Sequence, residues 1–353
     1  MSVDNGLLIH QLRAREAVFV AFHGMTHMPY VICDPETFND EVWAFATEAL
    51  LKEFKEKITE RQIPIAGFRL EMKAAKGFYL TLYSMGVNEF VFVDENATTK
   101  IALSDLEKQP DTSAIPLPRR PLLNPTLKLS AIYYVQEILR KVPNEEKKTL
   151  PQLSDELYAN VARSRFLLAY QMPNDRVPLT EHLKKKDLKL YVTPLKDGRV
   201  TVPIFSDVYE LNKFQRGKQK VMALPVSFSS LVNFIKGDVN ALFMNPNGCG
   251  IILSRQLLDT ISRNYPDEVR TGVEEMMKIN EEIMKINQAQ KAASERIKMS
   301  RATPPSRTGV PGLSNASKVT VFAKARKNRL QAEEGKASGS TDMEKPDPSG
   351  GKA

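Results

Sequence analysis

The spacing of apolar residues changes part-way along residues 202–214. The continuous apolar run that opens this stretch is typical of a buried strand, and Leu211 and Phe214, three residues apart, share one face of a helix. Residues 42–54 show the same change of spacing. Val, Phe, Leu and Phe occupy the same four places in both stretches, without a gap. The pattern therefore predicts a tandem repeat of one unit in which a strand leads into a helix.

Further matches extend the repeat in both directions. The aligned pairs are Tyr30-Val31 with Tyr191-Val192, residues 87–91 with 239–243, and residues 101–104 with 251–254. Each unit is predicted to contain helix, strand, hairpin, helix, strand, helix, strand, hairpin and helix. Strand–helix–strand crossovers require parallel neighbours, whereas hairpins require antiparallel ones. We therefore predict an α/β (α+β) fold with two tandem mixed-sheet domains.

Composition divides the chain into five segments. Domain 1 takes residues 1–108 and domain 2 takes residues 150–262. The segment between them, 109–149, is a Pro-rich linker followed by a helix that we expect to dock on a domain. Residues 263–300 are predicted to form one long amphipathic helix. Residues 301–353 are rich in Pro, Ser, Gly and Lys, which predicts a disordered basic tail.

Composition also indicates the cellular compartment of the protein. The chain has 353 residues, of which 42% are hydrophobic, and its apolar runs are too short to span a membrane. The first residues lack the pattern of a signal peptide, and Cys33 and Cys249 are the two cysteines, which predicts a protein of the reducing cytoplasm. The net charge of +8 conceals an asymmetry, because residues 1–108 are net acidic and residues 150–262 are net basic.

The second unit carries an ordered series of short motifs. They are Lys189-Leu190-Tyr191-Val192, Asp197-Gly198-Arg199-Val200, Val202-Pro203-Ile204-Phe205-Ser206, Leu224-Pro225 with Ser230-Leu231, and residues 239–246. Over residues 150–262 this series resembles the N-terminal domain of the SseB family, the bacterial enhanced serine sensitivity proteins. The first unit looks like a diverged copy, with Trp43 where the second has Pro203. The resemblance implies a cytoplasmic bacterial protein that acts as an interaction or regulatory module, without an established enzymatic activity.

One loop gathers the side chains that come nearest to a metal site. His23, His27 and Cys33 lie close together in the sequence, but Gly24 and Pro29 predict a loop in place of the helix that would turn both histidines the same way. A zinc site needs three or four converging ligands. We therefore favour a structural role for these residues and predict no cofactor. An enzyme or metal site at this loop is kept as an alternative.

The two cysteines are weak candidates for catalysis. A nucleophilic cysteine needs a base within hydrogen-bond reach and a third group that orients the base. No local motif around Cys33 or Cys249 supplies this arrangement. Cys249 lies between Gly248 and Gly250, in a turn where a small residue fits. We therefore interpret both cysteines as structural and predict that the protein is not an enzyme.

We expect a protein partner to bind at the sheet faces and at the interface of the two repeats. Candidate interaction residues also lie in a basic stretch and on the long helix. The candidate residues are Lys213, Arg216, Lys218 and Lys220 of the basic stretch, and Met276, Met277, Ile283 and Met284 of the helix. Aromatic residues that would stack on bases are few in the basic stretch, which argues against nucleic acid. The expected partner is another protein or a second copy of the chain. The alternative function is a sensor that binds a small metabolite, such as an amino acid, between the two repeats.

Overall fold

The structure is a computed structural model that describes residues 5–171, 189–215 and 221–302, with side chains described as far as residue 295. The chain divides into two compact units, residues 1–291 and residues 292–353. Both predicted repeats belong to the first unit. None of the described helices is long and apolar enough to cross a membrane. The predicted tail lies, from residue 303 onward, outside the described residues.

The first repeat forms a six-stranded mixed sheet. Its elements are α1 (Gly6–Ala14), β1 (Ala17–His23), β2 (Val31–Cys33), β3 (Asp40–Phe45), α2 (Glu48–Thr59), β4 (Ile65–Glu71), the 3-10 turn η1 (Met72–Ala74), α3 (Ala75–Ser84), β5 (Glu89–Val93), β6 (Thr98–Ala102) and α4 (Leu103–Leu106). The strand order is β4-β1-β3-β5-β6, and β2 also pairs with β3. β3 and β5 run parallel, and the other pairs are antiparallel.

The second repeat forms a sheet with the same topology. Its elements are α6 (Leu150–Arg163), β7 (Arg165–Gln171), β8 (Thr193–Pro194), β9 (Val200–Phe205), α8 (Val208–Gln215), β10 (Val221–Ser227), α9 (Phe228–Leu231), the 3-10 turn η4 (Val232–Phe234), β11 (Val239–Met244), β12 (Ile251–Ser254) and α10 (Arg255–Asn264). The strand order is β10-β7-β9-β11-β12, with β8 also on β9. The long helix α11 (Pro266–Ala302) follows. The predicted fold class, two tandem mixed sheets followed by a long helix, is confirmed.

The repeats also share a contact between side chain and backbone. In the first sheet, Asn88 Oδ1 accepts a hydrogen bond from the Asp40 amide at 2.9 Å. In the second, Asn240 Oδ1 accepts one from the Val200 amide at 2.8 Å. Asn88 and Asn240 lie at the same place in the sequence alignment, so this part of the alignment matches the structure.

The last strands correct another part of the alignment. Ile101 and Leu253 occupy equivalent positions, because each lies opposite the corresponding residue of the neighbouring strand. The alignment of residues 101–104 with 251–254 is therefore wrong by two positions. Both stretches contain several aliphatic residues, and such a pattern leaves the register of an edge strand weakly specified.

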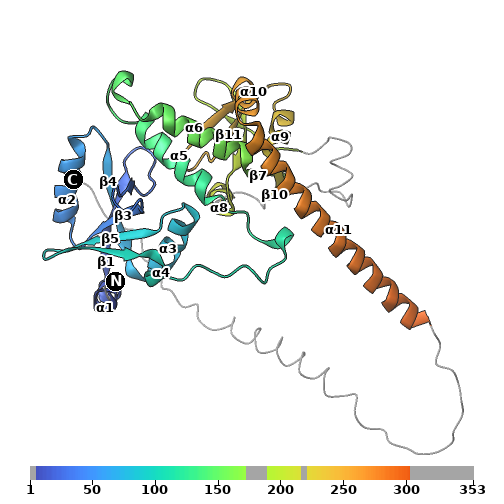
Figure 1. The fold of residues 1–353 in the computed structure, drawn as a ribbon, viewed down its shortest axis with the longest axis horizontal. Helices are drawn as coiled ribbons and strands as arrows, with labels where there is room; N and C mark the ends of the chain where they lie inside the picture. Colours follow the sequence, from blue (N-terminus) through green and yellow to red (C-terminus); the bar gives the residue numbers. More distant parts are fainter. Residues whose placement is uncertain (1–4, 172–188, 216–220, 303–353) are drawn as a thin grey trace, which may run out of the picture. The chain divides into compact units, whose positions relative to one another are not determined.

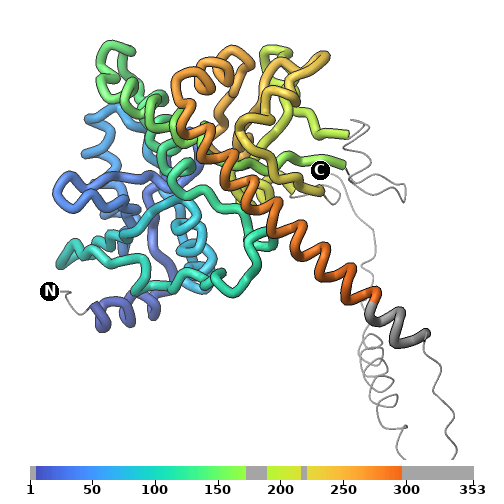
Figure 2. Tube along the Cα trace, turned by 45° about the vertical axis from the view of Figure 1, so that its right-hand side comes forward, coloured from blue at the N-terminus to red at the C-terminus, as the bar shows by residue number. Residues whose placement is uncertain are grey.

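The helix of the Pro-rich linker is α5 (Pro125–Ile138), which lies between the 3-10 turns η2 (Leu117–Arg119) and η3 (Asn144–Glu146). It packs against the first repeat. The Gln136 side chain exchanges two hydrogen bonds with the backbone of Val31 in β2, at 2.9 and 3.0 Å. Figures 1 and 2 show α5 and α6 between the two sheets. Apolar residues of both sheets and both helices form one continuous core, so the two repeats pack as one body.

Each sheet also carries a smaller core on its other face. In the first repeat this core contains Phe45 of β3 and Leu51 of α2, and in the second it contains Phe205 of β9 and Leu211 of α8. All four residues belong to the repeated Val, Phe, Leu and Phe pattern. The pattern therefore reflects the packing of a strand against the helix that follows it. The segment boundaries drawn from the sequence stay predictions.

Candidate functional site

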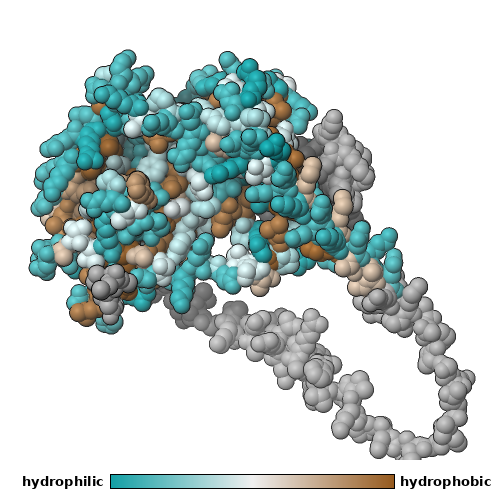
Figure 3. All heavy atoms as spheres, viewed as in Figure 1, coloured by the Kyte–Doolittle hydropathy of each residue, from teal (hydrophilic) through white to brown (hydrophobic). Residues whose placement is uncertain are grey.

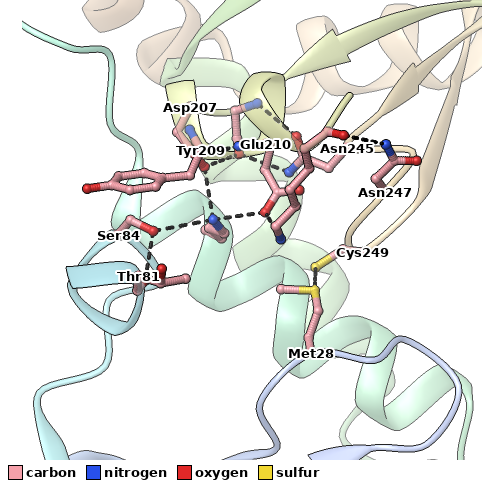
Figure 4. A network of polar contacts seen from close by, with 12 residues as sticks. Met28, Thr81, Ser84, Asp207, Tyr209, Glu210, Asn245, Asn247 and Cys249 are labelled. Carbon is pink, nitrogen blue, oxygen red and sulfur yellow. Dashed lines mark hydrogen bonds and ion pairs between the residues drawn. The ribbon is translucent and has the colours of Figure 1, made fainter. Parts of the chain in front are cut away.

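A buried ionic network lies where α5 meets the start of α8 (Figure 4). Lys128 of α5 is only 1% exposed. Its Nζ lies 3.2 Å from Asp207 Oδ2 and 2.9 Å from Glu210 Oε1. It also donates a hydrogen bond to Ser84 Oγ, at the end of α3, at 3.4 Å. The network therefore joins the first repeat, the linker helix and the second repeat.

Asp207 is placed in this network by its role as the cap of α8. Its Oδ1 accepts hydrogen bonds from the amides of Tyr209 and Glu210, at 2.8 and 3.0 Å. Its Oδ2 accepts a hydrogen bond from Ser206 Oγ at 2.7 Å. A carboxylate at a helix N-terminus satisfies free backbone amides and interacts favourably with the helix dipole.

Asn245 ties the end of β11 to the same junction. Its Oδ1 accepts a hydrogen bond from the Ser206 amide, and its Nδ2 donates one to Ser206 Oγ, both at 2.9 Å. The backbone of Asn245 has φ +52°, in the left-handed region that asparagine tolerates better than most residues. The Asn-Pro turn of the second repeat is therefore part of the support for α8.

Lys128 and Glu210 favour each other's charged forms. Burial alone acts to lower the pKa of Lys128, but the carboxylates of Asp207 and Glu210 outweigh burial, and the pKa is raised. Burial acts to raise the pKa of Glu210, but Lys128 and Lys213 outweigh it, and the pKa is lowered. Removing one partner of a buried ion pair costs about 3–5 kcal/mol, because the other charge is left unpaired. We assign the network a structural role in positioning α8.

A cavity of about 730 Å³ lies beside this network, between the two repeats. The loop of residues 25–28, helices α5 and α6, and the turn of residues 246–252 supply most of its lining. Lys213, a predicted interaction residue, also lines it, and its Nζ lies 2.8 Å from Glu210 Oε1. The size of the cavity is typical of a small-molecule site.

The three loop residues considered as metal ligands occupy different surroundings. His23 is fully buried, and its Nδ1 accepts hydrogen bonds from two loop amides at 3.4 Å, while burial lowers its pKa. His27 is exposed, has φ +54° and lines the cavity. Cys33 is exposed, and its thiol contacts the backbone oxygen of Asp34 at 3.8 Å. The structure thus brings His27, and not Cys33, to the space between the repeats.

An acidic group that the sequence did not indicate lies on the first sheet. Among the described residues, carboxylate oxygens of Asp34, Glu41 and Glu89 come within 4.8 Å of one another. Lys100 Nζ lies 2.7 Å from Asp34 and 2.6 Å from Glu41. The acids therefore already have a cation of the chain among them. Asp34 and Glu41 border a groove of about 840 Å³ that Trp43 also lines.

The predicted residues of the long helix differ in exposure. The exposed ones are Met277 at 58%, Ile283 at 39% and Met284 at 64%. Met276 is partly buried, and Gly272 and Ile279 are buried. A Cβ atom on Gly272 would lie 2.8 Å from the backbone oxygen of Arg163, so α11 packs closely on the end of α6 there. Figure 3 shows apolar atoms exposed along α11.

Part of the basic candidate surface falls outside the structure. Arg216, Lys218 and Lys220 lie outside the described residues, so only Lys213 of that surface has a position. In place of a free basic patch, Lys213 belongs to the ionic network and to the cavity wall.

Sequence reasoning missed the ionic network. One signal for it was present, because Asp207 followed three residues later by Glu210 resembles a capping box at a helix start. A second signal was Lys128, which lies among apolar residues of the docking helix. The sequence could not show that Lys128 pairs with these two acids, because about 80 residues separate them. A lysine is almost never fully buried unless it is paired, so its burial was not expected without a known partner.

The family comparison falls on the second repeat. A model of the SseB protein N-terminal domain matches residues 144–260. The chain carries an SseB N-terminal domain. The matched SseB segment contains the whole second sheet together with Asp207, Glu210, Asn245 and Cys249. The predicted resemblance is confirmed there, and the interpretation of the first repeat as a diverged SseB copy stays a prediction.

Other comparisons add little. Curated proteins include no match to the chain. Among solved structures, the chain is similar to Tic22 from Plasmodium falciparum, at 13% sequence identity and a TM-score of 0.18, over 72% of this chain and 96% of that chain. A likeness this weak supports no conclusion about fold or function.

Proposed function

We propose that this SseB-domain protein is a non-enzymatic binding module that contacts another protein through the exposed side of α11. The observation that carries the proposal is the exposure of Met277 and Met284, at 58% and 64%. They lie two turns apart and so share one side of the helix. Ile279, on another side, is buried. Methionine side chains adapt to irregular apolar surfaces, which suits a docking face.

The state of the buried thiol supports a non-enzymatic role. Burial, assisted by the nearby charge of Glu210, raises the pKa of Cys249 to about 12. The thiolate is the nucleophilic form of cysteine. Cys249 is therefore a neutral thiol at physiological pH and is not activated for attack on a substrate. His23, the buried histidine, uses Nδ1 to hold its own loop.

Quantitative affinity capture from the native host tests the docking face. The full-length chain is compared with a Met277→Gln/Met284→Gln variant and with a Lys278→Gln/Lys285→Gln control. The control residues are also exposed and have the same spacing on the same helix. We expect a specific protein that the control retains and the methionine variant loses. Partners that bind both variants equally, or no specific partner at all, would contradict the proposal.

The cavity between the repeats supports a second candidate, the metabolite sensor. Its volume of about 730 Å³ and its lining by both repeats suit a small ligand held at their junction. Ligand binding to the folded state raises the melting temperature. A thermal-shift screen with amino acids and related metabolites is therefore expected to stabilise the wild type. Asn247→Trp, which places a large ring at the exposed edge of the cavity, is expected to remove that shift. A shift that persists in this variant would place the ligand elsewhere.

A further inference from the structure

We propose that Met28 and Cys249 together bind one soft monovalent metal ion, Cu(I), at the junction of the two repeats. Met28 Sδ and Cys249 Sγ lie 3.6 Å apart, although 221 positions separate the residues in the chain. Figure 4 shows the two side chains pointing toward one another. Both are buried, at 4% and 7% exposure. The inference is independent of the proposed docking face on α11.

The separation of the sulfurs suits two ligands of one ion. Metal–sulfur bonds in proteins are about 2.3 Å long, so two sulfurs on one ion lie at most about 4.6 Å apart. The observed 3.6 Å falls inside that limit. The two sulfurs therefore lie within the span that one ion can bridge.

The loop that carries Met28 offers further donors. Met25 and His27 line the same cavity as Met28 and Cys249. The loop is held in place by other groups, because its amides at 25 and 26 donate to the His23 ring. The Met25 side chain is 54% exposed and the His27 side chain is exposed, so both are presented toward solvent at the cavity. Thioether and imidazole donors thus lie beside the buried sulfur pair.

The donor set selects the kind of ion. Soft thiolate and thioether ligands favour Cu(I), whereas carboxylate and carbonyl oxygens favour Mg²⁺ and Ca²⁺. The described lining of the cavity includes no carboxylate and includes the ammonium group of Lys213. A hard divalent ion would therefore find no carboxylate among these lining residues, and the ammonium group beside it is already paired with Glu210. A soft monovalent ion gains its affinity from the bonds to sulfur.

Charge balance also favours a monovalent ion. The Cys249 thiol enters the reaction protonated, loses its proton to solvent, and forms the bond to Cu(I), while the Met28 thioether adds without losing a proton. The thiol and the cation thus become a neutral thiolate–metal unit and one released proton. A neutral product avoids the desolvation cost of an unpaired buried charge. The apparent affinity is expected to rise about tenfold per pH unit as long as the free thiol is protonated.

Competition with a chromophoric Cu(I) chelator tests the site on the full-length chain under reducing conditions. We expect one equivalent of Cu(I) to be taken from the chelator, with the redox-inert Ag(I) competing for the same site. Met28→Leu keeps the volume and removes the sulfur. It is expected to weaken Cu(I) binding about 10–100-fold, a loss typical of impaired metal sites. Cys249→Ala is expected to weaken it at least as much.

Matched variants keep the experiment decisive. Cys33→Ser removes the other thiol, and Met277→Leu removes an exposed thioether, and both are expected to bind Cu(I) as the wild type does. X-ray absorption of the loaded wild type is expected to show sulfur ligation that Met28→Leu reduces. Should Cys249→Ala fail to fold, Met28→Leu alone decides the matter. Unchanged affinity in Met28→Leu, or loss of affinity in Cys33→Ser, would overturn the site and leave the two sulfurs as a packing contact.

Discussion

The two repeats hold the same strand–helix junction in different ways. In the first repeat, the amide of Ala46 donates to the backbone oxygen of Val93 at 2.9 Å. In the second, the amide of Ser206 donates to the side-chain oxygen of Asn245 at 2.9 Å. Ala46 and Ser206 follow the same repeated phenylalanine, so one backbone geometry is maintained by two different acceptors.

The difference extends into the helix that follows. Leu50 in the first repeat occupies the position of Glu210 in the second, and Glu210 is the residue that meets Lys128 of the linker helix. The repeated apolar residues thus specify the fold of each unit. The polar residues that differ between them specify how the second repeat is attached to α5. The strand–helix junction of the first repeat is held by apolar packing. The junction of the second repeat is held by apolar packing and by ion pairs.

The largest expected effect comes from removing the cation of the second junction. Lys128→Met leaves the buried carboxylate of Asp207 without its cation and Glu210 with Lys213 alone. It is expected to cost about 3–5 kcal/mol of unfolding free energy. Chemical denaturation measures the loss. Lys73→Met is the control, because Lys73 pairs with Glu71 at the surface and such pairs contribute about 0–1 kcal/mol. Equal losses of unfolding free energy in the two variants would contradict a special contribution of the buried network to the second junction.

The next largest loss of stability is expected at Gly248, in the turn that packs against Glu210. A Cβ atom on Gly248 would lie 2.5 Å from Glu210 Oε2, whereas nothing lies within 4 Å of a Cβ on Gly77. Gly248→Ala is expected to destabilise the protein by about 1–3 kcal/mol through overpacking. Gly77→Ala, in helix α3, is expected to stabilise it by about 0.5–1 kcal/mol. Thermal unfolding of both variants checks the opposite signs.

Removing the helix caps of the two repeats is expected to change the free energy of unfolding by different amounts. Thr47 caps α2 through one hydrogen bond, to the Leu50 amide, so Thr47→Ala is expected to cost about 1 kcal/mol. Asp207 caps α8 and also belongs to the ionic network, so Asp207→Ala is expected to cost more. Denaturant titrations of both variants measure the difference. A larger loss from Thr47→Ala would be inconsistent with the assigned role of Asp207.

The pH dependence of stability gives the smallest effect. The pKa of Glu210 is lower in the folded protein than its ordinary value of 4.5. Its contribution is therefore fully present above pH 4.5 and is lost as the pH falls through the lower, folded pKa. Glu210→Gln is expected to flatten the acid side of the stability curve. Glu53→Gln, which changes an exposed carboxylate of α2, is the control variant.

Much of the fold was predictable because apolar spacing carries it. The strand and helix around Phe45 and the matching ones around Phe205 were predicted, and both residues are buried in the corresponding cores. The register of the last strands was predicted wrongly, because short aliphatic runs fit in more than one alignment.

The candidate sites were much less predictable. Lys128 and Glu210 come together only through the packing of α5 against the second repeat. Met28 and Cys249 meet across the two repeats, and sequence spacing paired the loop histidines with Cys33, which lies nearest along the chain. Contacts of this kind depend on the tertiary arrangement, which local propensity and motif spacing do not contain.

A double-mutant cycle between Lys128 and Glu210 tests most directly that an ionic network attaches the second repeat to α5. Lys128→Met and Glu210→Leu are measured singly and together by chemical denaturation, the second change copying Leu50 of the first repeat. Because each single change already removes the contact between Lys128 and Glu210, the double variant is expected to lose less than the sum of the two, by about 1–3 kcal/mol. Losses that add to within about 0.5 kcal/mol would contradict the account.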